Sequence, residues 1–214
     1  GPERKSRVIS DAEKAIIAYH EGGHAVVQRI LPKCDPVAKV TIISRGMALG
    51  YTMALPQEDR YLQSKTEFED KIAGLLGGNV AERMIFGDTT TGASNDIEKA
   101  TDLARRMVTE FGMSDKLGPL SFGKRDEMVF LGRSMGEQRD YSEEVARTID
   151  EEVRAIIDRA YERATEVLTT HRDRLVALIV QRDSTRHVDV AEPLDAVDDL
   201  ETATLDDLDD RTTV

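Results

Sequence analysis

Apolar residues recur at intervals of three and four along most of this 214-residue chain, and that spacing predicts a mainly α-helical fold. We expect helices at about residues 11–31, 66–86, 95–111, 143–168 and 171–179. The fourth stretch carries its apolar positions as one stripe, which is typical of a helix packed on a core. With the fifth, it predicts a long C-terminal helical hairpin.

Local signals mark the ends of these helices. Ser10, followed three residues later by Glu13, is the pattern of a capping box. Pro32 ends the first helix because it has no main-chain N–H to donate, and Gly87 closes the second. The other expected N-terminal caps are Ser94 or Asn95, Ser142 and Thr170.

Two segments rich in β-branched and aromatic residues, 37–43 and 49–55, predict short strands around Arg45-Gly46. Further short strands are expected near Leu120–Phe122 and Met128–Leu131. Glycines occupy positions 22, 23, 74, 77 and 78 within the first two expected helices, where each costs roughly 1 kcal/mol relative to alanine. We therefore expect tight packing against another element at these positions.

The first expected helix contains His20-Glu21-Gly22-Gly23-His24, the His-Glu-x-x-His pattern. Residues four apart lie on the same face of a helix, so both imidazoles can reach one metal ion. The pattern is typical of zinc peptidases, in which the glutamate acts as general base. A buried helix with two structural histidines is the weaker interpretation, because packing alone does not require a glutamate beside a histidine in an apolar run.

The spacing of the motif does not supply a third ligand. A catalytic zinc site takes three protein ligands and keeps one position open for water. The extension of the motif that carries a third histidine does not fit the residues after His24, and His171 and His187 are poorly placed, on the last helix and in the tail. A carboxylate is therefore expected. Asp96, in the first turn of the third helix, is favoured over Glu82 on the second, and both stay open at this point.

Cysteine usage and charge exclude several classes of protein. Cys34 is the single cysteine, which rules out an internal disulfide and fits a reducing compartment. No histidine lies at a spacing from Cys34 that would support this cysteine as a metal ligand or nucleophile. The net charge is −12, and no basic patch favours binding to nucleic acid. No apolar stretch is long enough to span a bilayer, so this chain is expected to be soluble.

The charge is uneven and predicts two regions. Residues 183–214 hold eleven acidic residues and two arginines, a net charge of −9, with few apolar residues. Such a segment cannot bury enough apolar surface to fold, so we expect an acidic, mostly disordered tail. The folded domain is expected over residues 1–182.

From Gly1 to about Leu178, the chain resembles the peptidase domain of the FtsH family of membrane-anchored AAA+ zinc proteases. The matching pieces follow in the same order. They include Ala18-Tyr19-His20-Glu21-Gly22-Gly23-His24-Ala25, Arg45-Gly46-Met47-Ala48-Leu49-Gly50-Tyr51-Thr52, Gly77-Gly78, Ala81-Glu82, Thr91-Gly92-Ala93-Ser94-Asn95-Asp96 and Tyr141-Ser142-Glu143-Glu144-Val145. The sequence departs from the family at Gly22, where alanine is usual, and after Leu178.

The resemblance implies a helical zinc-peptidase domain with a small β-hairpin or sheet, a C-terminal helical hairpin and an acidic tail. It implies that Asp96 joins His20 and His24 as third zinc ligand, that Glu21 is the general base, and that Glu82 orients a ligand. It also implies an upstream ATPase module and membrane anchor, a hexamer, and a peptidase domain that faces the cytoplasm at the cell membrane. The substrates would be unfolded or membrane-extracted proteins.

Two other functions compete with a zinc endopeptidase. An oligomerising assembly module with a structural zinc, or none, is disfavoured by the intact Glu21, because a structural site needs no base. A zinc hydrolase of small molecules is weaker still, since no compact substrate pocket can be argued from the residues. The strand near residues 50–53 is either an edge to which an extended peptide adds or an ordinary hairpin strand.

Overall fold

Helix α1 (Asp11–Ile30) begins with the capping box that the sequence predicts: the Ser10 hydroxyl accepts a hydrogen bond from the Glu13 main-chain N–H, and the Glu13 carboxylate accepts one from the Ser10 N–H. The helix ends before Leu31 and Pro32, as expected. The structure is a computed structural model that describes residues 10–41, 51–54, 62–123, 141–183 and 188–189.

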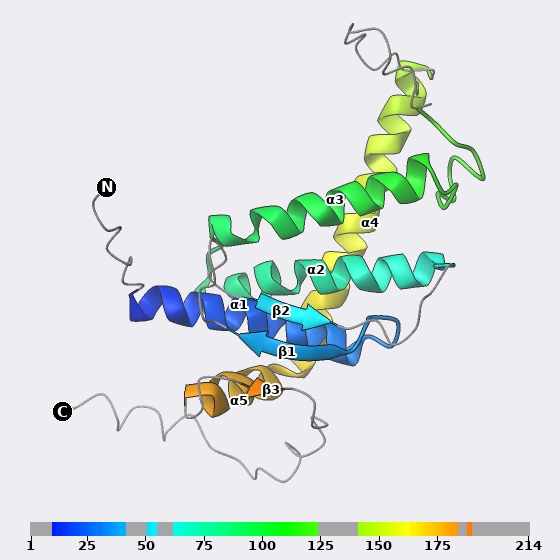
Figure 1. Cartoon of the computed structure of the whole chain (residues 1–214). Helices are drawn as coiled ribbons and strands as arrows, with labels where there is room; N and C mark the ends of the chain where they lie inside the picture. The colour runs from blue at the N-terminus through cyan, green and yellow to red at the C-terminus, as the bar shows by residue number, and fades with distance from the viewer. Residues whose placement is uncertain (1–9, 42–50, 55–61, 124–140, 184–187, 190–214) are drawn as a thin grey trace, which may run out of the picture.

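Helix α2 (Lys65–Phe86) lies beside α1 and forms the most extensive contact between elements in the described structure (Figure 1). It carries a second capping box, formed by Ser64 and Glu67, and ends at Gly87 in the left-handed conformation at φ 70°. This C-terminal end was predicted.

Helix α3 (Ser94–Thr109) lies on the other side of α2, and its start differs from the prediction. A short 3₁₀ turn, η1 (Thr91–Ala93), leads directly into α3, so that Ala93 occupies the N-cap position without a side-chain hydrogen bond. Ser94 and Asn95 are therefore helical residues, and the prediction that one of them caps the helix was wrong. The Thr90 hydroxyl caps the 3₁₀ turn by accepting a bond from the Gly92 N–H.

Helix α4 (Glu143–Thr170) starts at the predicted cap, Ser142, and crosses behind α2 and α3 (Figure 1). It continues through Thr170 to a C-cap at His171, and α5 (Arg172–Asp183) follows at once. Thr170 thus belongs to α4 and does not cap α5, which corrects the prediction.

A three-stranded antiparallel sheet in the order β2-β1-β3 lies against α1. Strands β1 (Val37–Thr41) and β2 (Tyr51–Ala54) form the predicted pair, with Val40 opposite Thr52. The third strand, β3 (Val188–Asp189), pairs with β1 and falls within the tail that was expected to be disordered. Residues 42–50, 128–131 and 190–214 lie outside the described part of the chain.

Residues 120–122 form no strand, so that prediction was wrong; the structure has only an isolated bridge nearby, between Ser114 and Gly118. The core lies where α1, α2, α3 and α4 meet. Its largest fully buried apolar side chains are Ile72, Met107, Ile149, Leu168 and Leu175. Among the described residues, no helix carries an apolar run of the length a bilayer requires. The mainly helical fold agrees with the prediction.

Candidate metal centre

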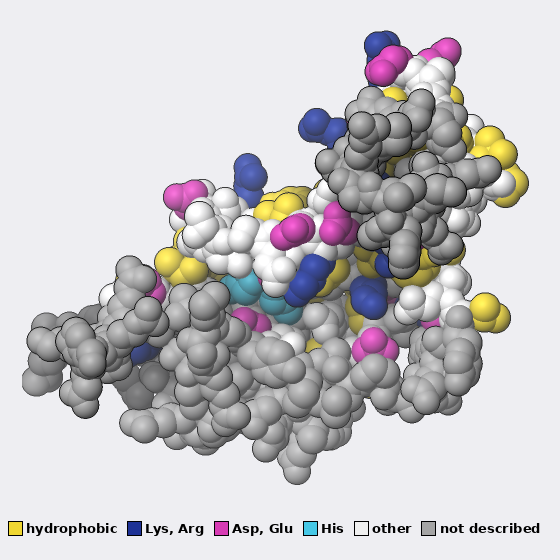
Figure 2. Space-filling model, turned by 45° about the horizontal axis from the view of Figure 1, so that its top comes forward, with side chains coloured by type: hydrophobic (Ala, Val, Ile, Leu, Met, Phe, Trp, Pro, Cys, Tyr) yellow, Lys and Arg dark blue, Asp and Glu magenta, His cyan; other side chains and the backbone are white. Residues whose placement is uncertain are grey.

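Two histidines on α1 point their Nε2 atoms at each other. His20 and His24 are both largely buried, their rings meet edge to face, and their Nε2 atoms lie 3.0 Å apart. The helical spacing of four residues produces this pairing, as the motif predicts. In the space-filling view, histidine side chains reach the molecular surface with acidic side chains close by (Figure 2).

Asp96 joins the two histidines from the first turn of α3. Its Oδ2 lies 3.4 Å from His20 Nε2 and 3.3 Å from His24 Nε2. These three residues are a group whose ligand atoms are close enough to hold one ion. Two ligand atoms about 2.0–2.1 Å from a tetrahedral zinc ion are separated by about 3.3 Å, so the triangle fits zinc.

Hydrogen bonds behind the rings fix which nitrogen faces the site. His24 Nδ1 lies 2.8 Å from the carbonyl oxygen of Gly74, which can only accept, so Nδ1 donates and Nε2 keeps a free lone pair. His20 Nδ1 lies 2.7 Å from Glu82 Oε1. Glu82 is itself almost fully buried, and its Oε2 accepts a bond from the Thr90 N–H at 2.6 Å. Both imidazoles are thus oriented as metal ligands usually are.

Glu82 therefore lies behind His20, on the far side of the ring from Asp96. The sequence left both carboxylates open as the third ligand. The structure places Glu82 against Nδ1 of His20 and Asp96 against the Nε2 atoms of both histidines. Among the residues that the structure describes, Asp96 alone completes a three-residue group with the histidines.

The protonation of the cluster follows from this geometry. Burial alone would lower the pKa of His20, but hydrogen bonds to Asp96 and Glu82 outweigh it and raise that pKa above its usual value. Burial would raise the pKa of Asp96, yet the hydrogen bonds that His20 and His24 donate from Nε2 when their rings are protonated lower it well below its usual range. The Asp96 carboxylate is consequently ionised at neutral pH, which is the state that binds a cation.

A glycine crossing brings the α2 backbone close to the histidines. A Cβ atom at Gly23 would lie 2.4 Å from the Gly77 carbonyl oxygen, and one at Gly78 would lie 2.6 Å from the Nε2 atoms of both His20 and His24. The helices can approach this closely only because neither position carries a side chain. The expected tight packing is therefore present, with main chain against main chain at Gly23.

Glu21 is buried beside the group, on the same turn of α1 as His20. Its carboxylate lies against β2, where the Thr52 hydroxyl is 2.5 Å from Oε2. The carboxylate is thus next to the histidines without being one of the three clustered ligands.

Comparison with known proteins shows the family to which the chain belongs. The sequence model of peptidase family M41 matches residues 7–182. The chain belongs to peptidase family M41. It is 60% identical over 178 residues to "ATP-dependent zinc metalloprotease FtsH 1" of Sphaerobacter thermophilus, covering 83% of this chain and 27% of the relative.

Two further relatives carry the name "ATP-dependent zinc metalloprotease FtsH". The one from Bacillus subtilis is 57% identical over 176 residues, which cover 82% of this chain and 28% of the relative. The one from Thermotoga maritima is 52% identical over 188 residues, which cover 86% of this chain and 31% of the relative. The chain thus spans less than a third of the length of these relatives.

The remaining candidates from the sequence are His171, His187 and Cys34. His171 caps the C-terminal end of α4, and His187 lies outside the described residues. Cys34 is half-buried and donates its S–H to the Asp70 carbonyl oxygen. Burial raises the pKa of Cys34 to about 12, so the thiol is neutral at ordinary pH and reacts poorly as a nucleophile.

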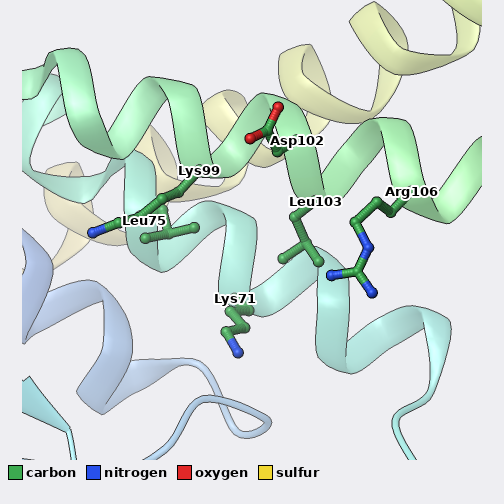
Figure 3. Close-up of a pocket in the computed structure, with 6 residues that line it drawn as sticks. All are labelled: Lys71, Leu75, Lys99, Asp102, Leu103 and Arg106. Atoms are coloured by element: carbon green, nitrogen blue, oxygen red, sulfur yellow. The ribbon is translucent and has the colours of Figure 1, made fainter. Parts of the chain in front are cut away.

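A groove of about 290 Å³ between α2 and α3 is separate from the metal centre, and none of the predicted site residues lines it (Figure 3). Its lining combines three cations and one acid with two leucines: Lys71, Lys99, Arg106, Asp102, Leu75 and Leu103.

Some contacts of the metal centre could not be predicted from the sequence. The Gly74 carbonyl and the Thr90 N–H are main-chain groups, which carry no sequence signal. Thr52 looks like any β-branched strand residue. The sequence predicts tight packing at Gly78, but nothing in it places this glycine against the histidine rings.

Proposed function

We propose that this chain is the peptidase domain of an ATP-dependent zinc metalloprotease and that His20, His24 and Asp96 hold the zinc ion. The observation that carries the proposal is the triangle of two Nε2 atoms and one Oδ2 atom, with both Nδ1 atoms engaged elsewhere. In this proposal, residues 1–182 are the peptidase domain and residues 183–214 are an acidic tail.

Glu21 is the proposed general base. When bound, zinc supplies Lewis acidity, which makes a water molecule acidic enough to react near neutral pH and polarises the scissile carbonyl. The Glu21 carboxylate accepts the proton of that water and later donates it to the leaving amine. Its place on the same turn of α1 as His20 supports this role, because a general base must lie within hydrogen-bond reach of the water that it deprotonates.

Glu82 is proposed to hold His20 in the ligand tautomer by accepting a hydrogen bond from its Nδ1–H group. The 2.7 Å contact supports this role. A carboxylate behind a metal-binding histidine also raises the basicity of the ring.

The proposed substrates are unfolded or membrane-extracted proteins. The open edge of β2 supports a peptide that adds by main-chain pairing, since within the described sheet β2 has a partner on one side only. Such pairing depends little on side chains, which suits degradation of many sequences. The likeness to FtsH proteases supports a hexamer, with the ATPase module and membrane anchor upstream in the whole protein and the peptidase domain in the cytoplasm.

An assembly module with a structural zinc is not favoured. Such a site has four protein ligands, whereas the described residues offer three at this position. The fourth position is then free for water.

Native mass spectrometry and peptide hydrolysis test the proposal together. The chain should bind one zinc ion, and Asp96→Ala should lose most of it. Glu21→Gln should keep the zinc but lower kcat by about 10²–10⁴-fold. Full zinc retention in Asp96→Ala would reject the ligand assignment, and an active Glu21→Gln variant would reject the base.

A further inference from the structure

The carboxylate of Glu21 has one specific partner, and it comes from the sheet. Thr52 Oγ1 lies 2.5 Å from Glu21 Oε2 and 3.2 Å from the Glu21 carbonyl oxygen. A hydroxyl has a single proton to donate. The shorter contact, to a negatively charged oxygen, takes that proton, because a charge-assisted hydrogen bond is the stronger of the two.

This hydrogen bond makes the two oxygens of the Glu21 carboxylate different. Oε2 is engaged by Thr52, while Oε1 has no hydrogen-bond partner among the residues that the structure describes. A general base must lie within about 2.6–3.2 Å of the atom that carries the proton, so a freely rotating carboxylate would spend much of its time out of reach. Anchoring one oxygen restricts the side chain and leaves the other available.

The donor is held firmly. Thr52 is β-branched, so its χ1 angle has few alternatives. It lies opposite Val40, which is 2% exposed and belongs to the strand that packs against α1. The sheet therefore fixes the hydroxyl relative to the helix that carries Glu21.

We propose that Thr52 is a positioning residue for the general base: its hydroxyl holds the Glu21 carboxylate in the orientation that receives the proton. The inference rests on the proposed role of Glu21. It also links the base to β2, the strand to which the substrate is proposed to add, so the same strand orders the peptide and the group that acts on it.

Two substitutions at position 52 separate this role from a purely structural contact. Thr52→Val keeps the shape and the β-branch but removes the donor. Thr52→Ser keeps the donor and removes a methyl group. Thr165→Val is a matched control, because the Thr165 hydroxyl bonds to the Tyr161 carbonyl within α4 and touches no site residue.

The first measurement is hydrolysis of an unstructured, internally quenched peptide by the zinc-loaded 214-residue chain. Loss of orientation at a reacting group costs on the order of 10²-fold for a displacement of about 1 Å. We expect Thr52→Val to lower kcat by about 10–100-fold with KM within about twofold of wild type, and Thr52→Ser and Thr165→Val to stay near wild type. An unchanged kcat in Thr52→Val, or an equal loss in Thr52→Ser, would overturn the inference.

The second measurement does not depend on activity. Crystal structures of wild type, Thr52→Val and Thr52→Ser should show the Glu21 carboxylate displaced only in the valine variant, while zinc content stays at one per chain in all three. A carboxylate that keeps its place without the hydroxyl would overturn the inference.

These outcomes are distinct from failure of the proposed function. That failure would appear in the wild-type chain, as absence of zinc or as hydrolysis that survives Glu21→Gln. The crystallographic comparison would still decide whether Thr52 orients Glu21.

Discussion

His20 Nδ1 and Glu82 Oε1 lie 2.7 Å apart across the interface between α1 and α2. The Glu82 side chain is 2% exposed, and its other oxygen accepts the Thr90 N–H, so it ties three segments together at one point. The ring of His20 is therefore held from behind by a group that is fixed on both of its oxygens.

Glu82→Gln should weaken zinc binding without abolishing it. Glutamine keeps the shape, and its amide oxygen can still accept a hydrogen bond from Nδ1–H. Its NH2 group then faces the Thr90 N–H, and the negative charge that favours a basic ring is lost. Losses of about 10–100-fold in metal affinity are typical when such partners are changed. Competition with a chromogenic chelator measures the affinity. The result contradicts the assignment if Glu82→Gln loses zinc as completely as Asp96→Ala, because Glu82 would then act as a ligand.

Gly78→Ala should damage the metal centre, whereas Gly22→Ala should leave it intact. The new Cβ at position 78 would lie 2.5 Å from His20 Cε1 and 2.6 Å from the Nε2 atoms of both histidines. At position 22 it would meet the ends of the Leu175 and Ile179 side chains at 2.9 and 3.0 Å, and these can rotate away. Zinc content and Tm report both effects.

The control is built into this pair, since both variants add the same methyl group to a helical glycine. Alanine gains up to about 1 kcal/mol of helix propensity over glycine, so a drop in Tm for Gly78→Ala would be a packing effect. Equal zinc content in the two variants would show that the α2 backbone has room to move.

Cys34 should resist alkylation in the native chain. Its pKa is raised to about 12 by burial, and only the thiolate reacts. Relative to a thiol with an ordinary pKa of 9.0, the thiolate fraction at pH 8 falls by roughly a thousandfold. Mass spectrometry after iodoacetamide should find little adduct in buffer and complete reaction in urea. Rapid labelling without denaturant would mean that the loop after α1 opens readily.

Removal of zinc should leave the domain folded. The two rings are held by Glu82 and by the Gly74 carbonyl without any metal, and the core around α2 does not depend on the site. Zinc at 100 times its Kd adds only about 2.7 kcal/mol of stability. A chelator should therefore lower Tm while the far-ultraviolet circular dichroism at 25 °C is retained. Collapse of the helical signal would instead indicate a fold that forms only with metal, as in zinc fingers.

The features that the sequence predicts correctly are the local ones. Ser10 and Glu13 act within one helical turn, and His20 and His24 are brought together by helical spacing alone. Such interactions depend on neighbours along the chain, and a pattern of a few residues is enough to define them.

The features that it misses depend on tertiary contacts. Helix α3 lacks the predicted side-chain cap because a 3₁₀ turn leads into it, and Glu82 of α2 anchors that turn through the Thr90 N–H. Thr52 meets Glu21 across 31 positions only because of how the sheet lies on α1. Thr170 has the residue type of a cap, yet α4 continues through it and ends at His171.

The pairing of β3 with β1 bears on how the protein can be shortened. Val188 and Asp189 pair with Val40 and Lys39, so the beginning of the acidic segment supplies the third strand of the sheet. Truncation after α5 to remove the charged tail would leave β1 and β2 as a two-stranded sheet that depends on its packing against α1, since an isolated hairpin is marginally stable. A crystallisation variant that ends after Asp189 keeps β1, the partner of the strand that carries Thr52, paired on both sides.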